Sequence, residues 1–180
     1  TWIKILSKVK NSVLWLYVLN KQTMENLKKE MTKNFISDDR IIFAKKVDAE
    51  LHLARLKFAD LCLDTLPYNG HTTTSDALWT GVPVLTCVGK TFAGRVSASL
   101  LTASNMNELI TKNLADYENL AVELATDTKK LNTIKDKLKN NNKTSKLFNS
   151  EVFNKNLEMA YKTIYKNYHL DLTIEDIYIS

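Results

Sequence analysis

The chain has 180 residues, of which 44% are hydrophobic and 25% charged, and it carries a formal net charge of +5. These proportions suit one globular domain with a sizeable core. No apolar run reaches the roughly 20 residues of a bilayer-spanning helix, so we expect no membrane span. The histidines and cysteines show no metal-ligand spacing, so we expect no metal site. Cys62 and Cys87 lie in apolar patterns that are typical of buried thiols in a cytoplasmic protein.

Short β-rich runs alternate with amphipathic helical patterns over roughly the first hundred residues. This alternation is typical of an α/β domain in which helices flank a parallel sheet. The strand patterns are nearly continuous in apolar residues, which predicts strands buried on both faces. Helices are expected over 2–9, 23–34, 49–58 and from about 73, and strands over 12–18, 40–44, 61–64 and 82–88.

From residue 91 onward the pattern predicts almost only helix, over 91–101, 106–113, 116–139 and 150–168. The last of these runs carries an aromatic stripe at helical spacing, for which core packing is the favoured interpretation. The stripe consists of Tyr161, Ile164, Tyr165 and Tyr168.

The excess positive charge is concentrated between Lys129 and Lys146, where seven lysines accompany the single acidic residue Asp136. A nucleic-acid-binding surface usually interleaves aromatic residues or arginines with its lysines, and this segment has neither. A solvated helix face followed by a polar loop is therefore the favoured interpretation, and nucleic-acid binding is the alternative.

The stretch 69–83 joins the predicted strand 61–64 to the helix that begins near Thr73. Backbone N–H groups at a helix start have no partner within the helix, and the helix dipole adds partial positive charge there, so phosphate groups bind well. The residues at this place indicate a nucleotide diphosphate site, with an acidic side chain one turn later for ribose hydroxyls; simple N-capping is the alternative. They are Gly70, His71, Thr72, Thr73 and Asp76.

The loops 44–49 and 65–71 follow predicted strands. Ligands of doubly wound sheets bind beyond the carboxyl ends of the strands, so His52 and His71 are expected on one rim of the sheet. The sequence has no G-x-G-x-x-G run and no P-loop motif, which argues against a dinucleotide-dependent dehydrogenase and against a P-loop NTPase.

Several segments, in one order along nearly the whole chain, resemble the C-terminal catalytic half of glycosyltransferase family 41. This family comprises the O-linked N-acetylglucosamine transferases and their bacterial and SPINDLY-like relatives. The matching segments are NSVLWL at 11–16, DRIIF at 39–43, LDT at 63–65, NGHTT at 69–73, DALW at 76–79, GVP at 81–83, RVSASLL at 95–101 and SKLFN at 145–149.

The resemblance implies the C-terminal half of a GT-B fold, with a Rossmann-like nucleotide-sugar-binding core over 1–104 and a helical part of the same domain over 105–180. It also implies roles for seven residues. His71, Thr72 and Thr73 would meet the pyrophosphate, Asp76 the ribose, and His52, Arg55 and the backbone of Val47 the uracil base.

One departure from the family pattern lies three positions before His52, where Ala49 stands in place of a ribose-contacting lysine. Lys45 or Lys46 would have to reach in from the preceding loop to replace it. Taken alone, His52 is also consistent with an ordinary histidine on a helix surface.

The resemblance implies transfer of N-acetylglucosamine from UDP to Ser or Thr of an acceptor protein. No carboxylate pair accompanies the predicted site, so we expect neither a metal nor another cofactor. Related alternatives are transfer of glucose from UDP to Asn and of fucose from GDP to Ser or Thr. A non-catalytic sugar-nucleotide-binding module is an alternative of another class.

The family places its acceptor site and proposed catalytic base on an N-terminal half, so no catalytic residue is assigned within this chain. That half, tetratricopeptide repeats and the first strand of the C-terminal half are expected ahead of Thr1. Without that strand the sheet should show an unpaired edge or gap. We therefore expect the chain to bind a sugar nucleotide and to be inactive alone.

Overall fold

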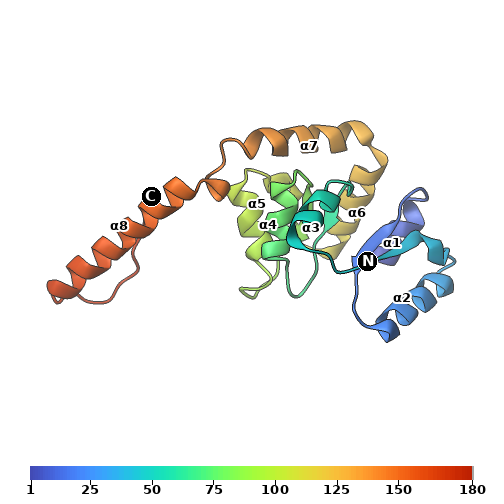
Figure 1. Cartoon of the computed structure of the whole chain (residues 1–180), viewed down its shortest axis with the longest axis horizontal. Helices are drawn as coiled ribbons and strands as arrows, with labels where there is room; N and C mark the ends of the chain where they lie inside the picture. The colour runs from blue at the N-terminus through green and yellow to red at the C-terminus, as the bar shows by residue number, and fades with distance from the viewer. Residues whose placement is uncertain (180) are drawn as a thin grey trace.

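The computed structural model describes residues 1–179 and shows parallel strands flanked by helices, followed by a helical C-terminal part (Figure 1). The strands are β1 Leu14–Tyr17, β2 Ile41–Ala44, β3 Cys62–Leu63, β4 Val84–Cys87 and β5 Ile110–Thr111. The α-helices are α1 Trp2–Lys8, α2 Lys21–Lys33, α3 Ala49–Leu56, α4 Thr72–Trp79, α5 Val96–Ala103, α6 Leu114–Thr126, α7 Thr128–Asn141 and α8 Ser150–His169.

The described strands form two separate parallel sheets. β1 pairs with β2, and β4 lies between β3 and β5 in the second sheet. Only β4 is buried along its whole length. β1, β2 and β3 are largely half-buried, and each of them lies at an edge of its sheet. The prediction of strands buried on both faces is therefore correct for β4 and wrong for these three.

Helix α1 packs against both sheets. Leu6 belongs to an apolar cluster with Ile41 of β2, and Ile5 belongs to another with Leu85 of β4. The Arg40 guanidinium, just before β2, donates to three carbonyl oxygens at the end of α1 and after it: Leu6 (2.9 Å), Val9 (2.7 Å) and Ser12 (2.9 Å). These contacts connect the β1–β2 sheet with the rest of the domain.

The segment 106–113 is not the predicted helix. Asn107–Leu109 is a short 3-10 turn, and it leads directly into strand β5. Leu109 is buried in the core, so its apolar side chain contributes to the pattern that predicts a helix here although no helix forms. The Thr111 hydroxyl donates to the Thr86 carbonyl oxygen (2.9 Å), so the segment is held by the sheet rather than by helical hydrogen bonds.

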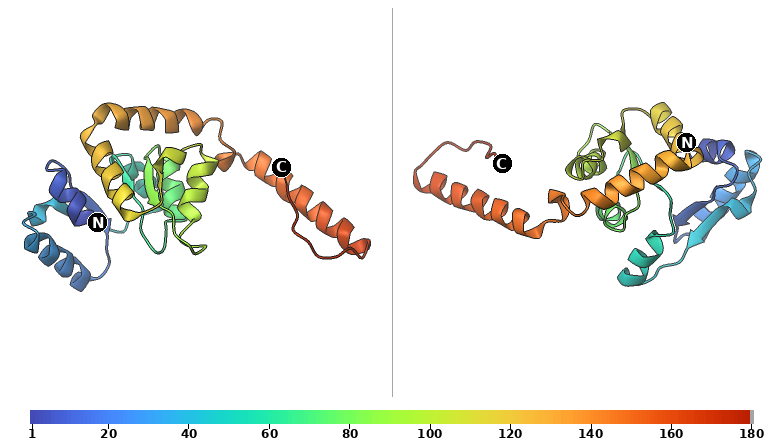
Figure 2. Two further views of the ribbon diagram at one scale, coloured as in Figure 1. Left: turned by 180° about the vertical axis from the view of Figure 1, so that it is seen from behind. Right: turned by 90° about the horizontal axis from the view of Figure 1, so that it is seen from above.

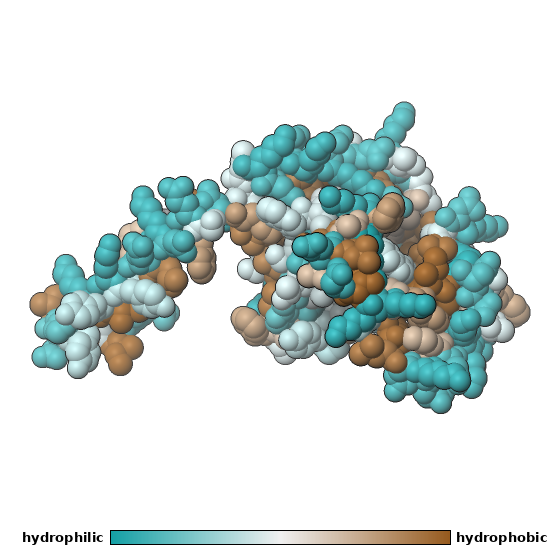
Figure 3. All heavy atoms as spheres, in the orientation of Figure 1, coloured by the Kyte–Doolittle hydropathy of each residue, from teal (hydrophilic) through white to brown (hydrophobic). Residues whose placement is uncertain are grey.

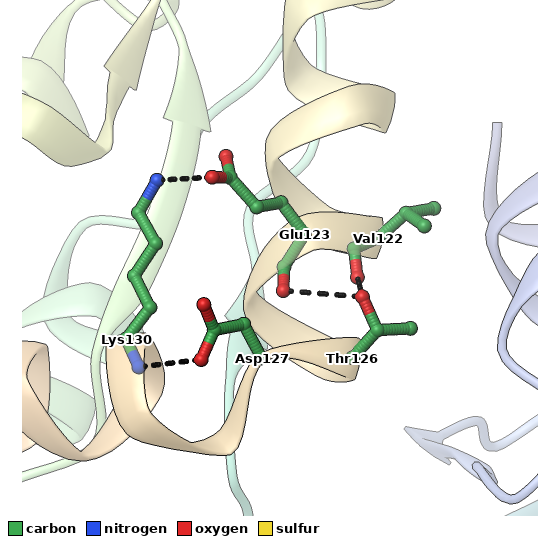
Figure 4. A network of polar contacts seen from close by, with 5 residues as sticks. All are labelled: Val122, Glu123, Thr126, Asp127 and Lys130. Atoms are coloured by element: carbon green, nitrogen blue, oxygen red, sulfur yellow. Dashed lines mark hydrogen bonds and ion pairs between the residues drawn. The ribbon is translucent and has the colours of Figure 1, made fainter.

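The predicted helix 116–139 is two helices, α6 and α7, which meet at Asp127 (Figures 1 and 2). The Asp127 carboxylate accepts from the Lys130 N–H (2.9 Å) and so caps α7. Figure 4 shows this cap, together with the ion pair between Lys130 and Glu123 (2.6 Å) that spans the bend. A strong capping residue inside a helical pattern therefore starts a new helix here.

The lysine-rich segment forms a solvated face of α7, as predicted. Leu131, Ile134 and Leu138 turn their side chains into the core on the other face of the helix. Three of the lysines pair with carboxylates on neighbouring elements: Lys130 with Glu123, Lys135 with Asp60 and Lys137 with Glu108.

Helix α8 extends away from the rest of the molecule in both Figure 1 and Figure 2. Its aromatic stripe is exposed, with 63% of Tyr161, 68% of Tyr165 and 78% of Tyr168 accessible. Figure 3 also shows some brown apolar surface along this arm. The predicted core packing of the stripe is wrong for this chain, because helical spacing defines an apolar face but does not supply the surface that covers it. None of the described helices combines the length and apolar character that crossing a membrane requires.

Candidate functional site

The predicted phosphate-binding loop connects β3 to α4 at the carboxyl end of β3. Asp64 follows β3 directly, and its N–H continues the strand ladder to the Leu85 carbonyl oxygen (3.0 Å). One Asp64 carboxylate oxygen accepts from the Gly70 N–H (2.6 Å), and the other accepts from the Thr86 hydroxyl of β4 (2.6 Å). The end of the loop is therefore tied to the sheet immediately before α4 begins.

Gly70 stands where no larger residue fits without a shift of its neighbours. A Cβ at this position would lie 2.5 Å from the Thr74 hydroxyl and 2.7 Å from the Thr73 hydroxyl, both on the first turn of α4. The Gly70 carbonyl oxygen accepts from the Ser97 hydroxyl of α5 (2.9 Å). The backbone thus approaches the start of α4 closely at this glycine.

The N-terminus of α4 carries no side-chain cap. His71 occupies the N-cap position and its side chain makes no capping hydrogen bond. Thr72 and Thr73 are exposed, and the structure gives their hydroxyls no hydrogen bond within residues 1–179. Five other described helices are capped by Asn or Asp side chains: Asn20, Asp48, Asn113, Asp127 and Asn149. The simple capping interpretation of Thr72 and Thr73 therefore has no hydrogen bond to support it.

The His71 ring lies between two aromatic side chains. Tyr68 stacks on it with ring centroids 4.9 Å apart, and Phe92 approaches it edge-on at 6.2 Å. The His71 Nε2 atom is buried without a hydrogen-bond partner in the described part of the chain. A buried polar atom without a partner is unfavourable, so a ligand atom that bonded to Nε2 would be stabilised there.

Asp76 lies one turn into α4 and is half-buried. Within residues 1–179 its carboxylate forms neither a hydrogen bond nor an ion pair with another side chain. It is available to accept hydrogen bonds from a ligand hydroxyl at the same helix end.

The second group of predicted residues lies around the loop between β2 and α3. The Arg55 guanidinium donates to the Lys45 carbonyl oxygen (2.7 Å) and to Nδ1 of His52 (3.2 Å). It also lies 5.6 Å from the centroid of the Trp15 ring, at a cation–π distance. His52 and Arg55 are thus held together by direct contacts, and their role at a base stays a prediction.

The backbone of Val47 makes no hydrogen bond within residues 1–179, so its N–H and C=O are free to bind a base edge. Ala49, Lys45 and Lys46 are exposed. Within residues 1–179 neither lysine side chain forms a hydrogen bond or ion pair, and a replacement of the family lysine by either one stays a prediction.

The group with His52 and Arg55 follows β2 of the first sheet, and the group with His71 follows β3 of the second sheet. Helices α3 and α4 pack against each other, but no hydrogen bond or aromatic contact joins His52 to His71 in the described structure. Their convergence on one ligand therefore stays a prediction. Residues 1–179 contain no cluster of three or more His, Cys, Asp or Glu side chains that could hold a metal ion.

Burial and the Asp64 charge raise the pKa values of two side chains beneath the loop, Cys62 and Tyr117. Burial, with a smaller contribution from Asp64, raises the pKa of the Cys62 thiol to about 11. Burial and the same charge also raise the pKa of Tyr117, whose hydroxyl donates to the Asp64 carbonyl oxygen (2.9 Å). Cys62 is therefore a protonated thiol at neutral pH and no candidate nucleophile.

The sequence interpretation assigned no role to four residues that shape this site. Asp64 and Ser97 fix the Gly70 peptide, and Tyr68 and Phe92 flank the His71 ring. The only local signal was the position of Asp64 directly after an apolar strand. Ser97 and Phe92 lie far along the chain from Gly70, so their contacts depend on the tertiary fold.

The fold is of the α/β class, with parallel sheets flanked by helices and a helical C-terminal part, and comparison with known proteins identifies its family. The model of glycosyl transferase family 41 matches residues 1–157. A UDP-N-acetylglucosamine–peptide N-acetylglucosaminyltransferase of Caenorhabditis elegans is 35% identical over 176 residues, which are 98% of this chain and 15% of that protein. The Arabidopsis thaliana protein "Probable UDP-N-acetylglucosamine--peptide N-acetylglucosaminyltransferase SEC" is 36% identical, over 89% of this chain and 17% of that protein.

A solved structure of a mutant O-GlcNAc transferase from Thermobaculum terrenum superposes with a TM-score of 0.85 at 29% identity, covering 92% of this chain and 32% of that one. The chain thus belongs to glycosyltransferase family 41, and the predicted fold class is confirmed. It spans about a sixth of the length of these curated relatives. The division at residue 104 stays a prediction; β5 of the second sheet lies beyond it.

The raised pKa of Cys62 predicts how stability depends on alkaline pH. An unfolded thiol ionises near its ordinary pKa of 9.0, whereas the folded thiol ionises only near 11. The folded state therefore binds this proton more tightly, and its advantage is complete below pH 9 and is lost as the pH rises toward 11. Urea denaturation should show a smaller fall in unfolding free energy over this interval for Cys62→Ala than for the wild type. Equal falls in both proteins would contradict the raised pKa.

Proposed function

We propose that this domain binds the diphosphate and nucleoside of a UDP-sugar, with the pyrophosphate at the N-terminus of α4. The observation that carries the proposal is the uncapped helix start beside a buried, unpartnered Nε2 atom of His71. Backbone N–H groups, the helix dipole and the Thr72 and Thr73 hydroxyls supply donors that a diphosphate needs. Asp76 supplies an acceptor for ribose hydroxyls.

The base is proposed to bind at the other group, against His52 and Arg55. The Arg55 guanidinium is held by the Lys45 carbonyl and fixes the orientation of the His52 ring through Nδ1. An oriented flat ring offers a stacking surface to a pyrimidine. The free backbone N–H and C=O of Val47 offer a donor and an acceptor to the polar edge of uracil.

The proposed reaction is transfer of N-acetylglucosamine from UDP to Ser or Thr of an acceptor protein, because several relatives are named for peptide N-acetylglucosaminyl transfer. Fixed donors around the diphosphate would stabilise the charge that develops on the leaving UDP. The acceptor groove and general base are proposed to lie in another part of the polypeptide. Glucose or fucose donors are the alternatives within the family, and Ala49 is the observation that favours a binding module without catalysis.

Nucleotide preference tests the proposed ligand. Calorimetry should show that UDP binds more tightly than UMP, because the second phosphate interacts with the N–H groups and dipole of α4. ADP should bind more weakly than UDP if His52 and Val47 recognise the pyrimidine. Equal affinity for UDP and ADP would contradict the base-binding role, and equal affinity for UDP and UMP would contradict the diphosphate site.

Replacing both Thr72 and Thr73 by alanine separates phosphate binding from capping. The hydroxyls make no hydrogen bond in the described structure, so the stability should change by less than the roughly 1 kcal/mol of a lost cap. UDP affinity should fall about tenfold or more, because hydrogen bonds to charged groups contribute roughly 1.5–3 kcal/mol each. The matched double serine variant keeps both hydroxyls and should retain UDP affinity. A loss of stability with unchanged affinity would return both residues to a capping role.

Activity assays test whether donor binding and catalysis reside in different parts of the polypeptide. A bound donor reacts only when a positioned nucleophile and proton acceptor are present, so the chain of residues 1–180 should transfer no sugar to peptides. A longer natural form with upstream sequence should transfer it, and His71→Ala or Asp76→Ala should abolish that transfer. Robust peptide glycosylation by residues 1–180 alone would contradict the assignment of the catalytic base to another part of the protein.

A further inference from the structure

The peptide unit on each side of Gly70 is held by a partly buried polar network of protein groups. The Gly70 N–H donates to one Asp64 oxygen (2.6 Å), and the other Asp64 oxygen accepts from the Thr86 hydroxyl (2.6 Å). Both carboxylate oxygens therefore face protein donors. Thr86 itself is fully buried, which keeps competing water away from this pair.

The carbonyl side of Gly70 is held equally firmly. The Ser97 hydroxyl donates its single hydrogen to the Gly70 oxygen (2.9 Å). It also lies 2.7 Å from the Thr74 hydroxyl, so Thr74 is the donor in that second bond. Ser97 and Thr74 are at most 2% exposed. The sheet, α4 and α5 thus converge on one glycine.

We propose that Asp64 is a positioning residue for the diphosphate site: its carboxylate sets the Gly70 peptide so that His71 and the first turn of α4 present their donors to the ligand. His71 follows Gly70 directly, so a rotation of this peptide moves the imidazole and the helix start together. This inference rests on the proposed function. It assigns Asp64 no contact with the ligand, because both of its oxygens are already bonded within the protein.

Electrostatics and positioning predict opposite effects for the loss of this carboxylate. A negative charge near a diphosphate repels it, so removing the charge alone should tighten UDP binding. Positioning predicts weaker binding, because the Gly70 N–H loses its acceptor and the turn is released. The sign of the change therefore separates the two effects without any assumption about magnitude.

Asp64→Ala and Asp64→Asn provide a graded test, with UDP affinity measured by calorimetry. Both variants remove the charge, but asparagine retains an oxygen that can accept from Gly70. Positioning predicts the order wild type, Asp64→Asn, Asp64→Ala, with the alanine variant about tenfold or more weaker than the wild type. Equal or tighter binding by both variants would overturn the proposal.

Tyr117→Phe is the matched control. It removes a buried hydrogen bond to the Asp64 carbonyl oxygen (2.9 Å) and leaves the Asp64 side chain and its partners unchanged. Thermal denaturation should show a loss of stability for this variant, with UDP affinity within about twofold of the wild type. If Tyr117→Phe weakens UDP binding as strongly as Asp64→Ala, general destabilisation explains both results and the positioning role is refuted.

Ser97→Ala provides a second route if Asp64→Ala does not fold. It releases the Gly70 carbonyl and leaves the Asp64 charge in place, and we expect it to weaken UDP binding as well. Amide hydrogen exchange at Gly70 and His71 should accelerate in the Asp64 and Ser97 variants and stay unchanged in Tyr117→Phe. Absence of UDP binding by the wild type would refute the proposed function and this inference with it, whereas wild-type binding with unaffected variants would refute the positioning role alone.

Discussion

The carboxylate of Asp64 is the point on which the arrangement of the loop depends. A charged group that is partly removed from water must find hydrogen-bond donors, and Asp64 finds one on β4 and one at Gly70. Because the same residue continues the ladder of β3, the end of the strand and the start of α4 become one rigid unit. The uncapped N–H groups of α4 are therefore exposed at a fixed place beyond the sheet, and not on a loop that could move.

The other half of the proposed site depends on a different set of contacts. His52 and Arg55 belong to the unit that contains β1 and β2, which pair with each other and with no strand of the second sheet. Helix α1, the Arg40 hydrogen bonds and the packing of α3 against α4 are among the described contacts that hold this unit to the remainder. The distance between the group proposed to bind the base and the group proposed to bind the diphosphate is thus set by helix packing, whereas the geometry within each group is set by direct hydrogen bonds.

The sequence alone correctly predicts those helices and strands whose ends are marked by residues close to them in the chain. The strand–loop–helix unit from β3 to α4 was predicted because Gly70 and the polar residues around it follow an apolar strand. The 106–113 segment was mispredicted because its apolar spacing fits both a helix and a turn followed by a strand, and β4 decides between them. The stripe on α8 was assigned to a core because periodicity does not reveal whether a partner surface is present. The sequence alone does not reveal the role of Asp64, because its partners Gly70 and Thr86 come together only in the folded chain.

The start of α4 bears on the choice between a structural and a binding role for the 69–76 segment. Asn and Asp side chains cap α2, α3, α6, α7 and α8, whereas α1, α4 and α5 begin without a side-chain cap. At α4 the capping position holds a histidine that does not cap, and a partly buried polar network fixes the preceding glycine. A helix start without a side-chain cap lacks roughly 1 kcal/mol of stabilisation. The hydrogen bonds around Gly70 do not supply this cap; they hold the backbone that precedes the N–H groups of α4 in one position. This combination is what a preorganised anion site requires, because donors fixed before binding need no reorganisation when the diphosphate arrives.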